Sequence, residues 1–127
     1  MKPALVVLLW WERRRIVFNL VVLAAGIVTV ATVLLVGSRL VDPGEDVVEP
    51  VALVAAVLVY AFLANACYCL GWVTELLWAG GDPSRTAPLR ARVFRLGLWF
   101  SVAVTLLPAV AIPAAWAILG FHHRTSP

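Results

Sequence analysis

Long apolar runs separated by short polar segments dominate the pattern of this chain. Three of these runs carry no charged residue, over about residues 16–37, 50–72 and 96–119. A helix rises by about 1.5 Å per residue, so a run of about 20 apolar residues crosses a hydrocarbon layer about 30 Å thick. We therefore predict three transmembrane helices, joined into a single transmembrane domain over residues 1–127.

A shorter apolar stretch precedes the first span. Residues 4–11 are apolar, and Glu12 and three arginines follow directly. Because so short a stretch cannot cross the hydrocarbon, residues 4–15 are predicted as a helical lead-in that lies in the membrane interface or extends the first span. Four spans are the alternative, which requires this stretch, or half of the last run, to cross alone. The predicted fold class is thus an all-α integral membrane helical bundle with three transmembrane helices.

Glycine and proline mark the boundaries of the spans. Gly37 ends the first span, Pro50 lies in the first turn of the second, and the Gly-Gly-Asp-Pro segment at 80–83 ends that helix. Pro108 and Pro113 lie within the last run. In a membrane protein, neighbouring groups satisfy the backbone carbonyls that proline frees, so we expect a kink there and not an end.

The composition supports a membrane protein. Hydrophobic residues make up 63% of the chain and charged residues 13%, whereas a soluble domain has about 25% charged residues. A soluble fold of this size would lack the polar side chains that cover its surface, so the lipid bilayer is the expected partner. The net charge is +3, but the basic clusters abut apolar runs, which indicates membrane topology and no nucleic-acid partner.

The distribution of charge predicts an orientation. Arg13–Arg15 precede the first span, and further arginines lie in residues 85–95, between the second and third spans. The loop 37–49 carries four acidic residues and one arginine. Because basic loops tend to stay in the cytoplasm, we expect a cytoplasmic N-terminus and localisation in a bacterial inner (cytoplasmic) membrane.

Two asparagines lie within the predicted spans. Asn19 and Asn65 both fall roughly 10 Å to the cytoplasmic side of the membrane midplane, counted at 1.5 Å per residue. An unpaired amide in hydrocarbon is costly, so each is expected to face the other or a backbone carbonyl of a neighbouring helix. We interpret the pair as a contact between helices; a polar site for a substrate or an ion is the alternative.

A charged cluster is predicted at the cytoplasmic ends of the spans. Glu75 lies at a depth similar to that of four arginines, Arg13, Arg14, Arg15 and Arg95. We predict ion pairs at the level of the lipid headgroups that hold the helix ends together. The alternative is a carboxylate that gates the mouth of a pathway.

Small residues recur at every fourth position of the third span. They are Gly97, Ser101, Thr105 and Ala109, followed by Pro113 and Ala117. Such a row allows another helix backbone to approach closely. We predict a helix-packing surface, which faces either the same chain or a second copy.

The sequence contains no motif of known chemistry. A glycine-rich phosphate loop, an HExxH pair and a CxxC pair are all missing, so no enzymatic activity, cofactor or metal is expected. We expect a structural or regulatory subunit that packs with itself or with a larger membrane partner. An oligomeric pore or small transporter is the alternative, and it would be lined by Asn19, Asn65, Ser101 and Thr105.

Two segments resemble known sequences. WWERRRIVFN (Trp10–Asn19) and NACYCLGWVTEL (Asn65–Leu76) are similar to motifs of small, uncharacterised bacterial multi-pass inner-membrane proteins. In those proteins an aromatic, glutamate and basic cluster precedes the first span, and an Asn…Cys-Tyr-x-Leu-Gly-Trp…Glu run ends the second. The resemblance implies a bacterial inner-membrane protein.

Overall fold

The computed structural model of the chain contains three helices: α1 (Pro3–Gly37), α2 (Pro50–Ala79) and α3 (Ala87–Thr125). The structure describes all residues except 1, 2, 40, 42, 43, 45, 47, 81, 83, 126 and 127, with the side chains of 3 and 119–125 also outside the description. All regular structure in the described part is helical, which confirms the predicted all-α fold class.

Each helix is long and apolar enough to cross a membrane, over Ala4–Gly37, Pro50–Ala79 and Ala87–Ile118. The described residues contain these three candidate spans and no fourth, so the alternative with four spans is wrong for this part of the chain. Residues 4–15 are continuous with α1. At about 1.5 Å per residue, α1 is about 50 Å long and exceeds a hydrocarbon layer of about 30 Å, so the lead-in lengthens the first helix beyond what a span needs.

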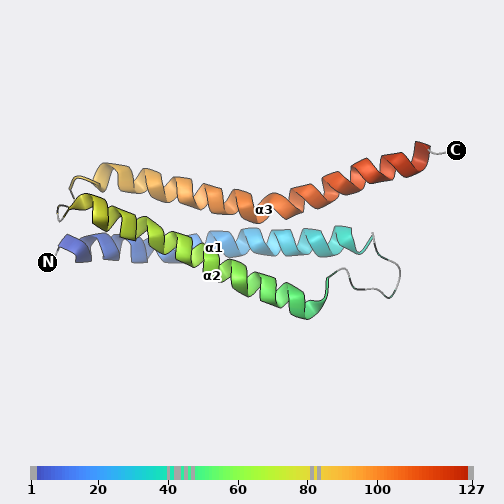
Figure 1. The fold of residues 1–127 in the computed structure, drawn as a ribbon, viewed down its shortest axis with the longest axis horizontal. Coiled ribbons are helices and arrows are strands. Elements are labelled where there is room, and N and C mark those ends of the chain that lie inside the picture. Colours follow the sequence, from blue (N-terminus) through green and yellow to red (C-terminus); the bar gives the residue numbers. More distant parts are fainter. Residues whose placement is uncertain are drawn as a thin grey trace.

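The helix boundaries follow the glycine and proline pattern. Gly80 takes the left-handed conformation, with φ 54°, and caps the C-terminus of α2. Pro50 occupies the first turn of α2. Pro108 and Pro113 lie inside α3 and do not end it. Figure 1 shows that α3 bends in its middle, as expected for a helix in which proline removes backbone hydrogen bonds.

The helices approach one another closely at one end of the molecule (Figure 1). We call residues 3–25, 64–79 and 86–101 the closed end, where the start of α1 lies beside the turn that joins α2 to α3. Residues 30–37, 50–59 and 106–118 form the open end, where α2 and α3 diverge. The contact between α1 and α3 is the most extensive in the bundle, and α2 crosses α1.

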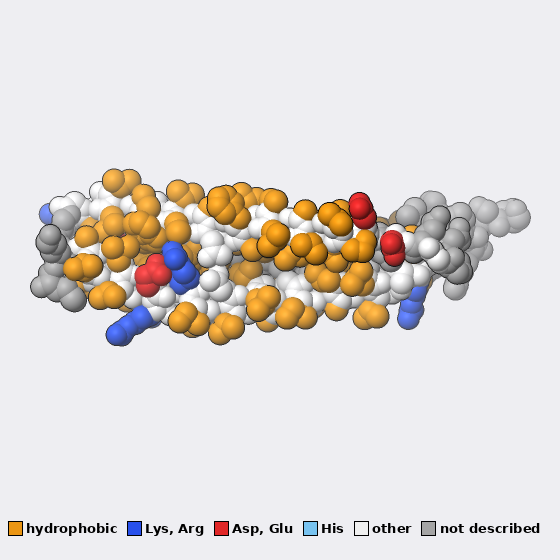
Figure 2. Space-filling model, turned by 90° about the horizontal axis from the view of Figure 1, so that it is seen from below, with side chains coloured by type: hydrophobic (Ala, Val, Ile, Leu, Met, Phe, Trp, Pro, Cys, Tyr) orange, Lys and Arg blue, Asp and Glu red, His pale blue; other side chains and the backbone are white. Residues whose placement is uncertain are grey.

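Burial differs sharply between the two ends. The buried hydrophobic cluster consists of Val7, Trp11, Phe18, Val22 and Tyr68, all in the closed end. In the open end, Gly37 alone is buried among the described residues. Figure 2 shows hydrophobic side chains over most of one face of the molecule, with charged side chains towards its two ends. Lipid is the solvent that covers such a surface without cost.

Candidate functional site

The carboxylate of Glu75 connects α1, α2 and α3 at the closed end. Its side chain is 7% exposed. Its Oε2 accepts a hydrogen bond from Trp11 Nε1 at 2.6 Å, and its Oε1 accepts from the Thr86 hydroxyl at 2.8 Å and from Arg90 Nε at 2.6 Å. Arg90 Nη2 also lies 2.5 Å from Oε1. We call these four residues the Glu75 cluster.

The turn between α2 and α3 brings Glu75 and Arg90 together. Glu75 lies about one helical turn before the end of α2. Arg90 lies about one turn after the start of α3, where its backbone N–H donates to the Thr86 carbonyl at 3.0 Å. Because the two helices run antiparallel across a short connection, residues equally far from that connection lie opposite each other.

The Glu75 cluster is suited to holding helices together. Both charged side chains are 7% exposed, so each would be strongly destabilised without the other. Donors already engage both carboxylate oxygens, and they come from α1, from α3 and from the residue that precedes α3. A carboxylate bound in this way fixes the arrangement of the helices, and its oxygens are occupied and not presented to a substrate.

The structure corrects the predicted partners of Glu75. Arg15 pairs with Glu12 on its own helix at 3.1 Å, and Arg95 Nε donates to the Ala91 carbonyl at 3.4 Å. Arg14 stacks on an aromatic ring, and Arg13 is exposed. The predicted cluster of Glu75 with Arg13, Arg14, Arg15 and Arg95 is therefore wrong in its partners. The position of a residue along its helix predicts its depth in the membrane but not which side of the helix faces the bundle.

Aromatic rings pack against the Glu75 cluster on the side that faces the middle of the bundle. The Trp11 ring packs edge-on against Tyr68 at 5.4 Å and lies 6.2 Å from Phe94. The Tyr68 hydroxyl donates a hydrogen bond to the Trp11 carbonyl, which ties α2 to α1. Gly71 leaves room for the indole, because a Cβ there would lie 3.0 Å from Trp11 Cη2. The position of Trp11 is thus fixed from several directions.

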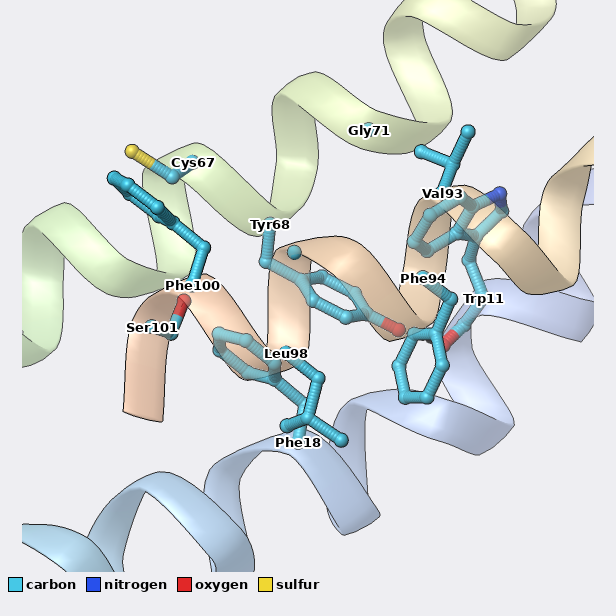
Figure 3. Close-up of a pocket in the computed structure, with 11 residues that line it drawn as sticks. Trp11, Phe18, Cys67, Tyr68, Gly71, Val93, Phe94, Leu98, Phe100 and Ser101 are labelled. Carbon is cyan, nitrogen blue, oxygen red and sulfur yellow. Dashed lines mark hydrogen bonds between the residues drawn. The ribbon is translucent and has the colours of Figure 1, made fainter. Parts of the chain in front are cut away.

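A pocket of about 180 Å³ lies between α2 and α3, with α1 beneath it. Figure 3 shows aromatic rings from all three helices around it, and its lining is mainly apolar. Trp11, Phe18, Tyr68, Phe94, Leu98 and Phe100 supply most of the lining, and Cys67, Gly71, Val93, Gly97 and Ser101 complete it. Trp11 belongs both to the pocket and to the Glu75 cluster, so the two features are contiguous.

The two asparagines do not meet in the structure. The Asn65 amide donates to the Ala61 carbonyl one turn earlier in its own helix, at 3.0 Å. Asn19 is exposed on α1. The expected contact between Asn19 and Asn65 is therefore wrong, because an asparagine near a helix carbonyl can satisfy its amide within its own helix.

A polar contact between the helices lies instead near the middle of the bundle. The Thr29 hydroxyl donates to the Thr105 carbonyl at 2.6 Å, and the Thr105 hydroxyl is hydrogen-bonded to the Tyr60 hydroxyl. The Tyr60 hydroxyl also donates to the Ser101 carbonyl at 3.3 Å. We call Thr29, Tyr60, Ser101 and Thr105 the polar seam. It joins all three helices at the boundary between the two ends.

The small residues of the row in α3 differ in how deeply they are buried. Thr105 is buried, and Ser101 and Ala109 are half-buried. Gly97 is exposed, and a Cβ built on it would meet nothing within 4 Å. At Ser101 and Thr105 the row thus faces other helices of the same chain. A second copy is not needed to cover these two positions.

Within the described residues no group of three or more His, Cys, Asp or Glu side chains is placed to hold a metal ion. Cys67 and Cys69 are free thiols, and Cys69 Sγ accepts from Arg15 Nη2 at 3.2 Å. The side chains of His122 and His123 lie outside the described residues.

Several residues of the site were not predicted from the sequence: Trp11, Thr86 and Arg90 of the Glu75 cluster, and Tyr60 of the polar seam. The register of the α2–α3 hairpin contained a usable signal for Arg90, since it lies about as far after the turn as Glu75 lies before it. Trp11 stands in a run of apolar residues, and nothing in the sequence shows that Trp11, and not its neighbour Trp10, points into the bundle.

Comparison of the chain with protein-family models, with curated proteins and with solved structures finds no match. The resemblance of the Trp10–Asn19 and Asn65–Leu76 segments to small bacterial multi-pass proteins therefore stays a prediction. The fold and the site define the class of the protein, a helical bundle with three helices able to span a membrane.

Proposed function

We propose that the chain is a non-enzymatic structural or regulatory subunit that packs with itself or with a larger protein in the membrane. The observation that carries this proposal is the contrast between the ends of the bundle. The polar groups of the Glu75 cluster and the polar seam are engaged within the chain, whereas α2 and α3 diverge beyond the seam.

The open end offers surface for further helices. Val51, Val54 and Leu58 of α2 are 71%, 58% and 65% exposed, and Leu107 and Val110 of α3 are 64% and 67% exposed. Ala52, Ala55 and Ala56 are exposed on α2 as well, and small residues permit close approach of another helix. Packing between helices in lipid relies on this kind of contact, since lipid tails already satisfy apolar surface.

A matched pair of substitutions tests the proposal. Ala56 and Ala66 are both exposed on α2, but Ala56 lies in the open end and Ala66 in the closed end. We expect Ala56→Leu to release the second copy or the larger partner from the complex isolated in mild detergent, and Ala66→Leu to leave it intact. The mass of the complex by native mass spectrometry reports the outcome, and equal effects of the two substitutions would contradict the proposal.

An oligomeric pore or small transporter is the alternative. Its proposed lining residues do not share one surface, because Thr105 is buried inside the chain while Asn19 is exposed on α1. A closed ring of copies with liposome flux that disappears in Asn65→Leu, while the fold is retained, would favour the pore over the subunit.

We further propose that the closed end faces the cytoplasm of a bacterial cell, across its inner membrane. Seven described arginines lie at the closed end or in the adjoining turn: Arg13, Arg14, Arg15, Arg85, Arg90, Arg92 and Arg95. Asp46 and Glu49 lie in the connection at the other end. Basic segments favour the cytoplasmic side.

Cysteine labelling in intact cells tests this orientation. In a background in which Cys67 and Cys69 are replaced by Ala, we expect an impermeant thiol reagent to label Asp46→Cys but not Ser84→Cys. Labelling of both positions in intact cells, or of Ser84→Cys alone, would contradict the proposed orientation.

A further inference from the structure

We propose that the pocket between α2 and α3 holds one acyl chain of a membrane lipid. The pocket takes the acyl chain, and the headgroup lies outside it. The site does not depend on whether the protein acts as a subunit or as a pore. It follows from the direction of the pocket, from the chemistry of its walls and from the contacts that hold those walls in place.

The pocket follows the helices over about two turns. Its lining runs from Trp11 to Phe18 on α1 and from Val93 to Ser101 on α3. At about 1.5 Å per residue, these stretches are about 10 Å and about 12 Å long. Helices that span a membrane lie close to its normal, with a modest tilt, and lipid acyl chains extend in the same direction. An acyl chain can therefore lie along the pocket, whereas a side chain from a neighbouring helix would enter from the side and fill only part of it.

The inner wall of the pocket is buried and its rim is exposed. Phe18 and Tyr68 are both buried, with their ring centres 4.8 Å apart, and Figure 3 shows these rings between the helices. Cys67, Val93 and Phe100 are exposed. Cys67 and Phe100 also belong to the uncharged runs of the second and third spans, and none of the described lining residues is charged. The pocket thus opens to the hydrocarbon, and an occupant can enter it from the lipid.

The polar side chains of the wall offer little to water. The Trp11 N–H donates to Glu75 at 2.6 Å, and the Tyr68 hydroxyl donates to the Trp11 carbonyl. The Ser101 hydroxyl and the Cys67 thiol are the other hydrogen-bonding side chains among the described lining residues. A buried water typically forms about three hydrogen bonds, and apolar cavities that lack such partners take up apolar ligands. The walls therefore favour a hydrocarbon chain over water.

Directional contacts hold the pocket open. The hydrogen bond to Glu75 fixes Trp11, and Gly71 leaves room for the indole, since a Cβ there would lie 3.0 Å from Trp11 Cη2. On the α3 side, Gly97 has no side chain, and a Cβ built on it would meet no atom within 4 Å. Because the walls are already in place, little conformational entropy is lost when an acyl chain enters.

Photo-crosslinking of the full protein in lipid nanodiscs tests the site. The probe is phosphatidylcholine with a diazirine in the middle of one palmitoyl chain. Tyr68 lies about 10 Å before Glu75 on α2, counted at about 1.5 Å per residue, which is a depth that mid-chain carbons reach. We expect adducts with Tyr68, which is buried, and with Leu70, which is exposed at nearly the same depth. Lipid that only surrounds the bundle reaches Leu70 and not Tyr68, so adducts with Leu70 alone would overturn the proposal.

Substitutions that fill the pocket show whether the adducts arise there. Gly97→Leu and Ser101→Leu should each lower the yield of Tyr68 adducts by about fivefold or more, because overpacking disfavours an occupant. The yield at Leu70 should stay unchanged. Gly26→Leu is the matched control, since a Cβ at Gly26 also meets nothing within 4 Å and Gly26 does not line the pocket. A loss of Tyr68 adducts in Gly26→Leu equal to that in Gly97→Leu, or no loss in either pocket variant, would overturn the proposal.

Native mass spectrometry of the full protein supplies a second measurement. With dipalmitoyl phosphatidylcholine added in detergent, we expect one lipid to stay bound after the others dissociate. Gly97→Leu should weaken its binding by the same factor of about fivefold or more. If Gly97→Leu does not fold, Gly97→Ala takes its place, with a loss of about twofold, because a methyl group takes up less of the pocket. No retained lipid on the parent, or equal retention by the parent and the folded variant, would contradict the acyl-chain site.

Discussion

The closed and open ends of the bundle differ in the side chains that the helices present to one another. At the closed end a buried carboxylate, a buried guanidinium and a cluster of aromatic rings fix three helices to one another. At the open end the helices present exposed apolar side chains and diverge. Apolar surface gains little from helix association in lipid, so directional contacts decide where membrane helices meet.

The polar seam lies between the closed end and the open end. Tyr60 and Thr29 contribute hydroxyl groups to α3 at Thr105, and beyond this level toward the open end no described side chain is buried. The comparison therefore predicts that a substitution lowers the free energy of unfolding in proportion to the directional contacts that it removes. Size and hydrophobicity of the substituted residue should matter less.

The largest effect is expected at Glu75. Glu75→Ala leaves Arg90 buried without its partner, which typically costs about 3–5 kcal/mol. We expect a loss of that size in the free energy of unfolding, measured by titration with a denaturing detergent. Glu12→Ala is the matched control, because Glu12 is exposed and its pair with the half-buried Arg15 is worth about 0–1 kcal/mol. Equal stabilities of parent and Glu75→Ala would show that the closed end is held by apolar packing alone.

A smaller loss is expected at Gly71. In Gly71→Ala the new methyl group would lie about 3.0 Å from Trp11 Cη2, and the hydrogen bond to Glu75 keeps the indole in place. Overpacking of this kind costs about 1–3 kcal/mol. Gly97→Ala on α3 meets no such contact and should leave the stability unchanged or raise it by up to about 1 kcal/mol. The same detergent titration distinguishes the two, and a loss in Gly97→Ala equal to that in Gly71→Ala would contradict the proposed close packing.

The polar seam should contribute less than the Glu75 cluster. Thr105→Val keeps the shape of the side chain but removes its hydroxyl from Tyr60, and such contacts in membrane proteins average about 0.6 kcal/mol. Thr32→Val is the control, because the Thr32 hydroxyl donates only to the Val28 carbonyl of its own helix. If both substitutions change the unfolding free energy equally, the seam does not hold helices together.

The smallest effect is expected in the turn between α2 and α3. The hydroxyl and backbone N–H of Ser84 donate to Asp82 and hold the pKa of its carboxyl below its ordinary value. A carboxyl whose pKa is lowered by folding stabilises the folded chain at any pH above its ordinary pKa of about 4. This stabilisation is lost as the pH falls through the lowered pKa of the folded chain. The melting temperature of Asp82→Asn should therefore lie slightly below that of the parent at pH 7. The difference should vanish in acid, and a difference that persists there would have another cause.

The class of the fold could be predicted because it depends on composition and length. Three uncharged runs define three spans, and Gly37, Gly80 and Pro50 mark their ends, as the structure confirms. The sequence also singled out Glu75, as a carboxylate at the end of a span, and Thr105, as a member of the row of small residues in the third span. Their positions relative to the lipid depend only on distance along each helix.

The partners of these residues could not be predicted in the same way. Whether Glu75 meets Arg90 or Arg95 depends on the rotation of each helix about its axis, and chains that are apolar on all sides give no signal for that rotation. For the same reason the sequence could not show that Asn65 bonds to Ala61 in its own helix. The hairpin register would have favoured Arg90, since it restricts pairing by distance from the turn.

The contrast between the two ends can be measured directly as distances between spin labels in lipid nanodiscs. Leu77 and Leu89 are exposed on α2 and α3 at the closed end, and Val54 and Ile118 are exposed on the same helices at the open end. We expect a narrow distance distribution for the Leu77–Leu89 pair and a longer, broader one for the Val54–Ile118 pair. Glu75→Ala should broaden only the first. Two distributions of equal width, or a closed-end pair that does not respond to Glu75→Ala, would contradict a bundle locked at one end.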